Sequence, residues 1–119
     1  MSTFNLNNVH ITGYMADVST AGQIYIPISD ETAGEVVEIR SALNGAIITA
    51  DAVITPKIGG TVMTNGTLTI TQSGSAAGDA DVSRPTGART VAAGDTIELE
   101  TNGASGNAIS VHFIITIKR

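Results

Sequence analysis

The chain has 119 residues, which is enough for one domain with its own core. It contains no Cys, and this excludes a disulfide framework, a Cys-based zinc site and thiol catalysis. The net charge of −5 argues against nucleic acid as a partner, because phosphate binding needs a dense face of Lys and Arg and the six basic residues are scattered. The sequence has no run of about 20 apolar residues that would predict a membrane span, and its N-terminal residues do not have the pattern of a signal peptide. We therefore expect synthesis in the cytoplasm and no membrane partner.

The first twenty residues mix Asn, Thr and Ser with isolated apolar side chains. This pattern predicts an N-terminal arm over residues 1–20, with one short strand around residues 9–14. Phe4, Leu6 and Val9 are its candidate apolar anchors.

From residue 21 onwards, apolar and polar residues alternate in two-residue steps, the period of half-buried strands. Segment 35–43 also fits two helical turns, but its β-branched residues and neighbouring strands favour a strand. In segment 23–29, Pro27 indicates an edge position or a bulge because proline has no N–H to donate. The predicted strands are residues 23–29, 35–43, 52–58, 67–71, 96–100 and 108–118.

Gly and Asn pairs punctuate these runs at intervals of roughly 8–12 residues, which is typical of a β-sandwich or barrel. We therefore predict a single domain over residues 21–119, all-β, with about 7–8 antiparallel strands. Residues 74–90 are polar and rich in Gly, and they predict a long loop, which in a compact domain is usually functional or disordered.

No set of residues predicts an active site. His10 lies in the arm and His112 on the outward register of a strand, so neither has a catalytic or metal-binding partner nearby in the pattern. Asp79 and Asp81 have the D-x-D spacing of a calcium loop without its later ligands. We expect a protein that is not an enzyme, with no catalytic residue, no cofactor and no metal site.

A pair of acidic residues, Glu98 and Glu100, stands on one strand face. Glycosidases use paired carboxylates, but sugar rings also need aromatic platforms, and the chain has no Trp, two Tyr and two Phe. A solvated strand face is the preferred interpretation of this pair.

Three segments are distinctive as a series: ADAVITPKIGG at residues 50–60, GTLTITQSGSAAGD at 66–79 and VAAGDTIEL at 91–99. Together with the final apolar strand they resemble the small decoration, or cement, proteins of tailed-bacteriophage capsids. The resemblance covers about residues 22–117 and is strongest between Ser41 and Gly106.

The resemblance implies a jelly-roll-like β-sandwich, often a homotrimer, that binds the major capsid protein between capsomers on the outside of the shell. It places the protein in the virion, at the capsid surface. For contacts with the capsid or between subunits we select the apolar arm residues and the charged residues of the long loop. These candidates are Phe4, Leu6, Val9, Asp79, Asp81, Arg84 and Arg89. The alternative is a receptor- or glycan-binding tip domain of a phage head or tail fibre.

Overall fold

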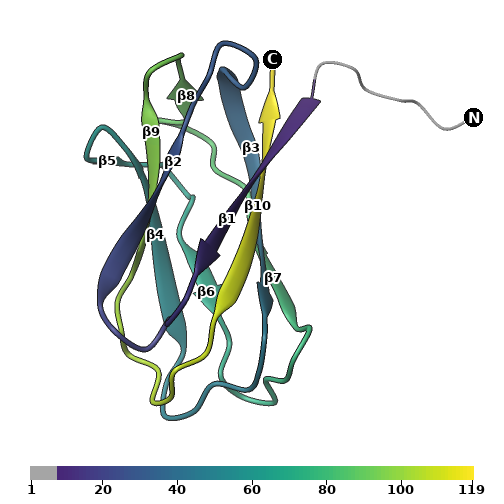
Figure 1. The fold of residues 1–119 in the computed structure, drawn as a ribbon, viewed down its shortest axis with the longest axis vertical. Coiled ribbons are helices and arrows are strands. Elements are labelled where there is room, and N and C mark those ends of the chain that lie inside the picture. Colours follow the sequence, from purple (N-terminus) through teal and green to yellow (C-terminus); the bar gives the residue numbers. More distant parts are fainter. Residues whose placement is uncertain (1–7) are drawn as a thin grey trace, which may run out of the picture.

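The computed structural model describes residues 8–119 as two β-sheets packed face to face, and this described part contains no helix (Figure 1). Most strands are separated by turns rich in Gly and Asn, which tolerate the backbone conformations that tight turns require. The ten strands are β1 (Asn8–Met15), β2 (Gly22–Pro27), β3 (Gly34–Leu43), β4 (Ala52–Ile58), β5 (Thr61–Val62), β6 (Leu68–Ile70), β7 (Ala80–Ser83), β8 (Thr90–Val91), β9 (Thr96–Thr101) and β10 (Val111–Lys118).

Strands that follow one another in the sequence mostly lie in opposite sheets. The first sheet, sheet A, has the order β1-β10-β3-β7, with β8 also paired to β3. The second, sheet B, has the order β2-β9-β4-β5, with β6 also paired to β4. Apart from the two-residue strands β5 and β8, this leaves eight strands in two antiparallel four-stranded sheets with jelly-roll topology. The expected fold class is confirmed.

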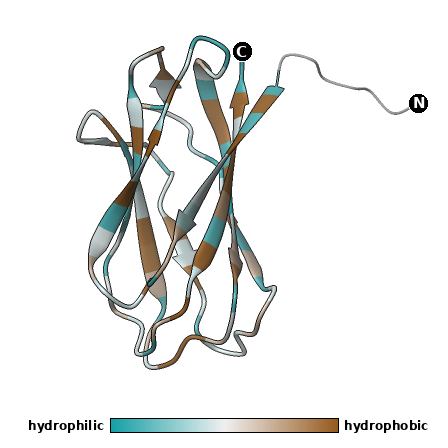
Figure 2. Ribbon diagram, viewed as in Figure 1, coloured by the Kyte–Doolittle hydropathy of each residue, from teal (hydrophilic) through white to brown (hydrophobic). Residues whose placement is uncertain are grey.

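The core lies between the two sheets and follows the two-residue alternation of the strands (Figure 2). Along β10 the inward side chains are Val111, Phe113, Ile115 and Ile117, all buried, while His112 faces outward and is exposed. β10 is central because it pairs with β1 on one side and β3 on the other.

A β-bulge explains the ambiguous pattern of segment 35–43. The pairing with β10 shifts between Thr116 and Ile117, so that Glu38 and Val36 lie opposite these consecutive residues. The bulge therefore brings Val36 and Ile39, three residues apart, to the buried side. A three-residue spacing mimics a helical turn, although the segment is a strand throughout.

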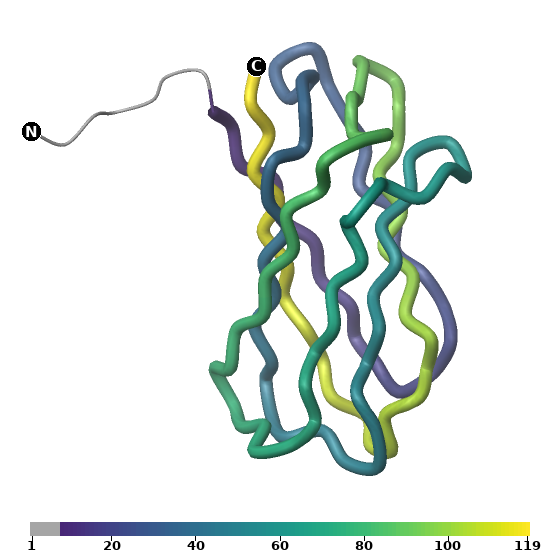
Figure 3. The backbone as a smooth tube through the Cα atoms, turned by 180° about the vertical axis from the view of Figure 1, so that it is seen from behind, coloured from purple at the N-terminus to yellow at the C-terminus, as the bar shows by residue number. Residues whose placement is uncertain are grey.

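The short strand expected around residues 9–14 is present as β1, which covers residues 8–15 and pairs with β10 along its whole length, so this part of the predicted arm belongs to sheet A. One boundary prediction needs correction. The long loop predicted for residues 74–90 contains β7, and Figure 3 shows this segment running beside β3. The period-two signal was weak in both places, since β1 carries Gly13 on its inward side and β7 is only four residues long.

Candidate interaction surface

The predicted arm residues divide between two situations. Phe4 and Leu6 lie outside the described residues. Val9 lies in β1, which turns its side chain inward, where it is half-buried and packs against the core. Its role in a contact with the capsid or with another subunit stays a prediction.

The two predicted acidic residues also have local roles. Asp79 closes a turn, where the Ala76 N–H donates to its Oδ2 at 2.9 Å. Asp81 lies in β7 opposite Ser41, whose hydroxyl donates to the Asp81 carbonyl oxygen at 3.5 Å. Partial burial raises the pKa of the Asp81 carboxyl above its usual value, and the negative charge of Asp79 adds to this effect.

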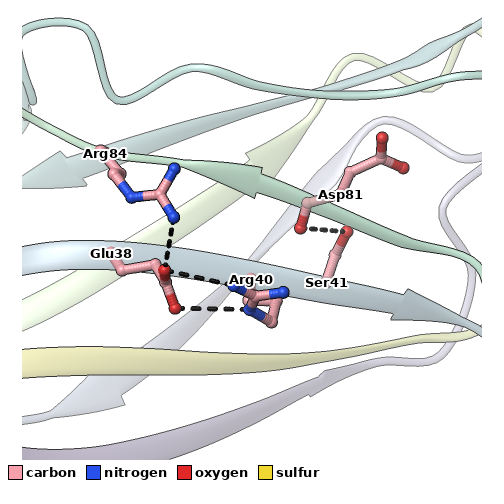
Figure 4. A network of polar contacts seen from close by, with 5 residues as sticks. All are labelled: Glu38, Arg40, Ser41, Asp81 and Arg84. Carbon is pink, nitrogen blue, oxygen red and sulfur yellow. Dashed lines mark hydrogen bonds and ion pairs between the residues drawn. The ribbon is translucent and has the colours of Figure 1, made fainter.

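The two predicted arginines are held by acidic residues of β3. Arg84 donates to Glu38 Oε1 at 3.2 Å, and Arg40 of the same strand donates to that carboxylate at 3.3 Å (Figure 4). Arg89 forms an ion pair with Glu35 at 3.4 Å. The two arginines therefore anchor the segment after β7 to sheet A, and they do not form a separate charged patch.

The outward face of sheet A arranges its side chains in three cross-strand rows, which follow from the pairing registers. The first two rows run from β1 through β10 and β3 to β7, and the third ends at Arg84, one residue after β7, which is paired to Glu38 by its charge. The rows change from apolar to charged along the strands. The first row contains Tyr14, His112, Ala42 and Ala80; the second contains Thr12, Ile114, Arg40 and Val82; the third contains His10, Thr116, Glu38 and Arg84.

The first two rows expose an apolar surface. Tyr14 is 53% exposed and its ring lies against that of His112, with centroids 4.9 Å apart. Ile114 and Val82 are also exposed, at 37% and 39%. A shallow hollow of about 250 Å³ lies beside His112 and Ile114, with Ala42 and Arg40 in its lining. We call this surface, made of the first two rows, the sheet A patch.

The outward face of sheet B is different in character. Glu98 and Glu100 lie at its centre on β9, and Lys57 of β4 donates to Glu100 Oε1 at 3.0 Å. The hydrogen bond with this carboxylate raises the pKa of Lys57 above its usual value. Tyr25 lies on this face opposite Glu98. Sheet B thus presents paired charges to solvent, and only sheet A presents a broad apolar area.

No group of three or more His, Asp and Glu side chains lies close enough to hold a metal ion within residues 8–119. Glu98 and Glu100 are paired to neighbouring strands along the face of sheet B, and they line no enclosed cleft together. Residues 8–119 also contain no helix that could span a membrane.

Sequence reasoning missed most of the sheet A patch. Two exposed apolar side chains that the alternation turns outward, Ile114 and Tyr25, lie on the outer faces of different sheets. Val82 was hidden because β7 was predicted as a loop. The available signal was the alternation of A-D-V-S itself, in which an apolar Val82 occupies an outward register beside Arg40.

The structure defines a small jelly-roll domain with one apolar and one charged outer face. A chain in the acid-stable capsid structure of Helicobacter pylori bacteriophage KHP30 is similar, with a TM-score of 0.58 and 10% identity; the match covers 94% of this chain and 87% of that one. Part of the catalytic unit of a GH87 α-1,3-glucanase from Streptomyces thermodiastaticus strain HF3-3 is also similar, with a TM-score of 0.57 and 12% identity, over 97% of this chain and 26% of that one. At these identities the likeness shows the fold alone. No protein-family model and no curated protein sequence matches the chain.

Proposed function

We propose that this chain is a structural protein of a bacteriophage virion that binds between capsomers on the outside of the capsid shell and stabilises it. It acts by assembly, without catalysis and without a cofactor. The observation that carries the proposal is the extent of the shared jelly roll, which occupies nearly the whole of this chain and of a chain in a phage capsid structure. The motif resemblance to decoration proteins supports the same function.

The sheet A patch is the surface we assign to contact with the major capsid protein. Exposed Tyr14, Ile114 and Val82 make most of it apolar, and Arg40 lies between Ile114 and Val82. Glu38 with Arg84 forms a charged margin on one side. Apolar and Arg side chains beside a polar rim are a usual composition of protein interfaces. The ion pairs of the rim are already formed within the chain, so docking does not have to neutralise an isolated charge there.

A homotrimer is the assembly we propose for this function. A closed shell repeats its local threefold positions, and a cyclic trimer offers three identical contacts to the subunits around each one. Three weak contacts made together bind far more tightly than one, because the second and third become intramolecular.

The test combines the purified chain with shells of the phage that encodes it. We expect the chain to sediment as a trimer, to co-sediment with mature shells at a fixed ratio and to raise the temperature at which the shells open. A chain that does not co-sediment with shells, and leaves their opening temperature unchanged, would refute the proposal.

A receptor- or glycan-binding tip domain is the competing function. Sugar rings are commonly held against aromatic side chains, and the two exposed tyrosines of the described residues, Tyr14 and Tyr25, lie on the outer faces of different sheets. They cannot line one sugar site together. Saturable saccharide binding by the purified chain, without binding to shells, would favour this competitor.

A further inference from the structure

β1 is the longest strand at the edge of a sheet in residues 8–119. It pairs with β10 on one side through eight residues, and within this part of the chain no strand pairs with its other side. Every second residue of such a strand directs its N–H and C=O away from the partner strand. β1 therefore presents a row of free backbone donors and acceptors, the feature that lets a sheet accept a further strand.

The edge of β1 lacks the usual protection. Its sequence, NVHITGYM, has no Lys, Glu, Asp or Pro, the residues that commonly block pairing at sheet edges. The other edge strands of residues 8–119 are shorter or interrupted: β2 ends in Pro27, β7 has four residues, β6 has three, and β5 and β8 have two each. The edge of β1 is thus the one best suited to accept an extended segment.

A partly exposed apolar seam lies below the same edge. Val9 and Ile11 of β1 and Ile24 of β2 pack against the core without being fully buried. Gly13 lets the two sheets approach here, because a Cβ at this position would lie 2.8 Å from Ile26 Cδ1 and 3.0 Å from Ile24 Cδ1. The inward side chains of a strand added to β1 would lie over this seam and complete the burial of Val9, Ile11 and Ile24.

We propose that the segment of residues 2–6 of a neighbouring copy pairs with this edge. In the sequence, Phe4 and Leu6 are two residues apart, so in an extended segment both side chains face the same way, towards the seam. Five extended residues span roughly 17 Å, which matches about five of the eight residues of β1. In the sequence only Asn7 separates this segment from β1, so a copy whose β1 begins near the β1 edge of another copy would bring the segment to that edge.

The inference rests on the proposed function for its oligomeric state. If each copy gives its segment to the next copy, the contact between copies is head-to-tail. Head-to-tail contacts close into a ring of n copies when each copy is rotated by one nth of a turn relative to the one before it. Three copies form a closed ring in which every β1 edge is occupied. The exchanged segment then holds the trimer together, while the sheet A patch stays available to the shell.

The first test uses the absence of native Cys. Leu6→Cys is combined in the full chain with Val9→Cys or with Ile11→Cys, because facing residues of paired strands are close enough for a disulfide. After oxidation we expect trimers on a non-reducing gel from at least one pair, and monomers from the control pair Leu6→Cys with Tyr25→Cys, since Tyr25 lies on sheet B. Monomers alone from both test pairs, or equal trimer formation in the control, would overturn the inference.

The second test separates the segment from the shell contact. Phe4→Asp with Leu6→Asp should shift the sedimenting species from trimer to monomer and keep the β-sheet circular dichroism spectrum. Phe4→Leu with Leu6→Ile should keep the trimer. A trimer that survives the Asp changes, with shells still bound, refutes the inference and leaves the proposed function standing. Cross-linked trimers that ignore shells refute the proposed function and leave the inference standing.

Discussion

Arg84 and Arg89 were equivalent in the sequence, yet their surroundings differ. The Arg89 guanidinium donates to the carbonyl oxygens of Pro85 at 3.1 Å and Val36 at 3.4 Å, and its side chain is 28% exposed. Arg84 is 65% exposed and reaches only the Glu38 carboxylate. We expect Arg89→Ala to lower the free energy of unfolding by about 1–2 kcal/mol. Arg84→Ala should cost no more than about 0.5 kcal/mol. Urea denaturation compares them, and equal losses would contradict these roles.

Asp81 gives a pH-dependent prediction. Burial raises the pKa of Asp81 in the folded state, so the ionised carboxyl destabilises the folded protein. The whole of this destabilisation is present at pH values above the folded pKa, and it disappears at pH values below the pKa of the unfolded chain. Asp81→Asn should therefore raise the melting temperature at pH 7. The gain should shrink as the pH falls towards the unfolded value of about 3.9. Thermal melts at pH 7 and pH 4 check this, and an equal gain at both would show that the carboxyl charge is not the cause.

At the scale of single elements, the sequence predicted strands wherever one face is fully buried. β4 was predicted with its observed bounds, and the buried side of β10 was assigned correctly, because both strands alternate without interruption. The bulge in β3 and the short β7 were harder to predict. Their positions are decided by pairing with residues distant in the chain, such as Glu38 with Thr116 and Ser41 with Asp81.

The candidate site was less predictable than the fold for the same reason. Outward residues carry no periodic signal of their own, and the sheet A patch exists only because the registers bring Tyr14 beside His112 and Arg40 beside Val82. The assignment of the charged loop residues to a partner's surface stays a prediction. The structure gives Arg84 and Arg89 partners on β3, which could be known only once β7 was located beside that strand.

The connection between β1 and β2 is tethered to β9 by one buried hydrogen bond. Thr101 is buried and its hydroxyl donates to the Val18 carbonyl oxygen at 2.8 Å. Thr101→Val keeps the volume but leaves that carbonyl without its donor, and should lower the free energy of unfolding by about 1–2 kcal/mol. Thr69→Val, on the exposed face of β6, should be close to neutral. Chemical denaturation of both variants is the measurement, and two neutral variants would show that the tether contributes nothing.

At the scale of the whole molecule, the two outer faces make the proposed docking directional. Sheet B carries the half-buried charges Lys57, Glu98 and Glu100 together at its centre, whose remaining water would have to be removed on binding. The sheet A patch instead surrounds one charged side chain, Arg40, with exposed Tyr14, Ile114 and Val82. If the patch docks on the shell, a carboxylate at position 114 loses its water there, and its cross-strand neighbour Arg40 is shared with Glu38.

Ile114→Asp should therefore weaken shell binding at least tenfold, which corresponds to about 1.4 kcal/mol. Val62→Asp is the matched control, because Val62 is similarly exposed, at 44% against 37%, but belongs to sheet B. Both side chains face outward, so both variants should keep the melting temperature of the parent chain within a few degrees. Co-sedimentation with shells over a range of concentrations gives the two affinities. If Val62→Asp weakens binding as much as Ile114→Asp does, the contact does not distinguish the sheets, and the docking face must be sought at the loops that join them.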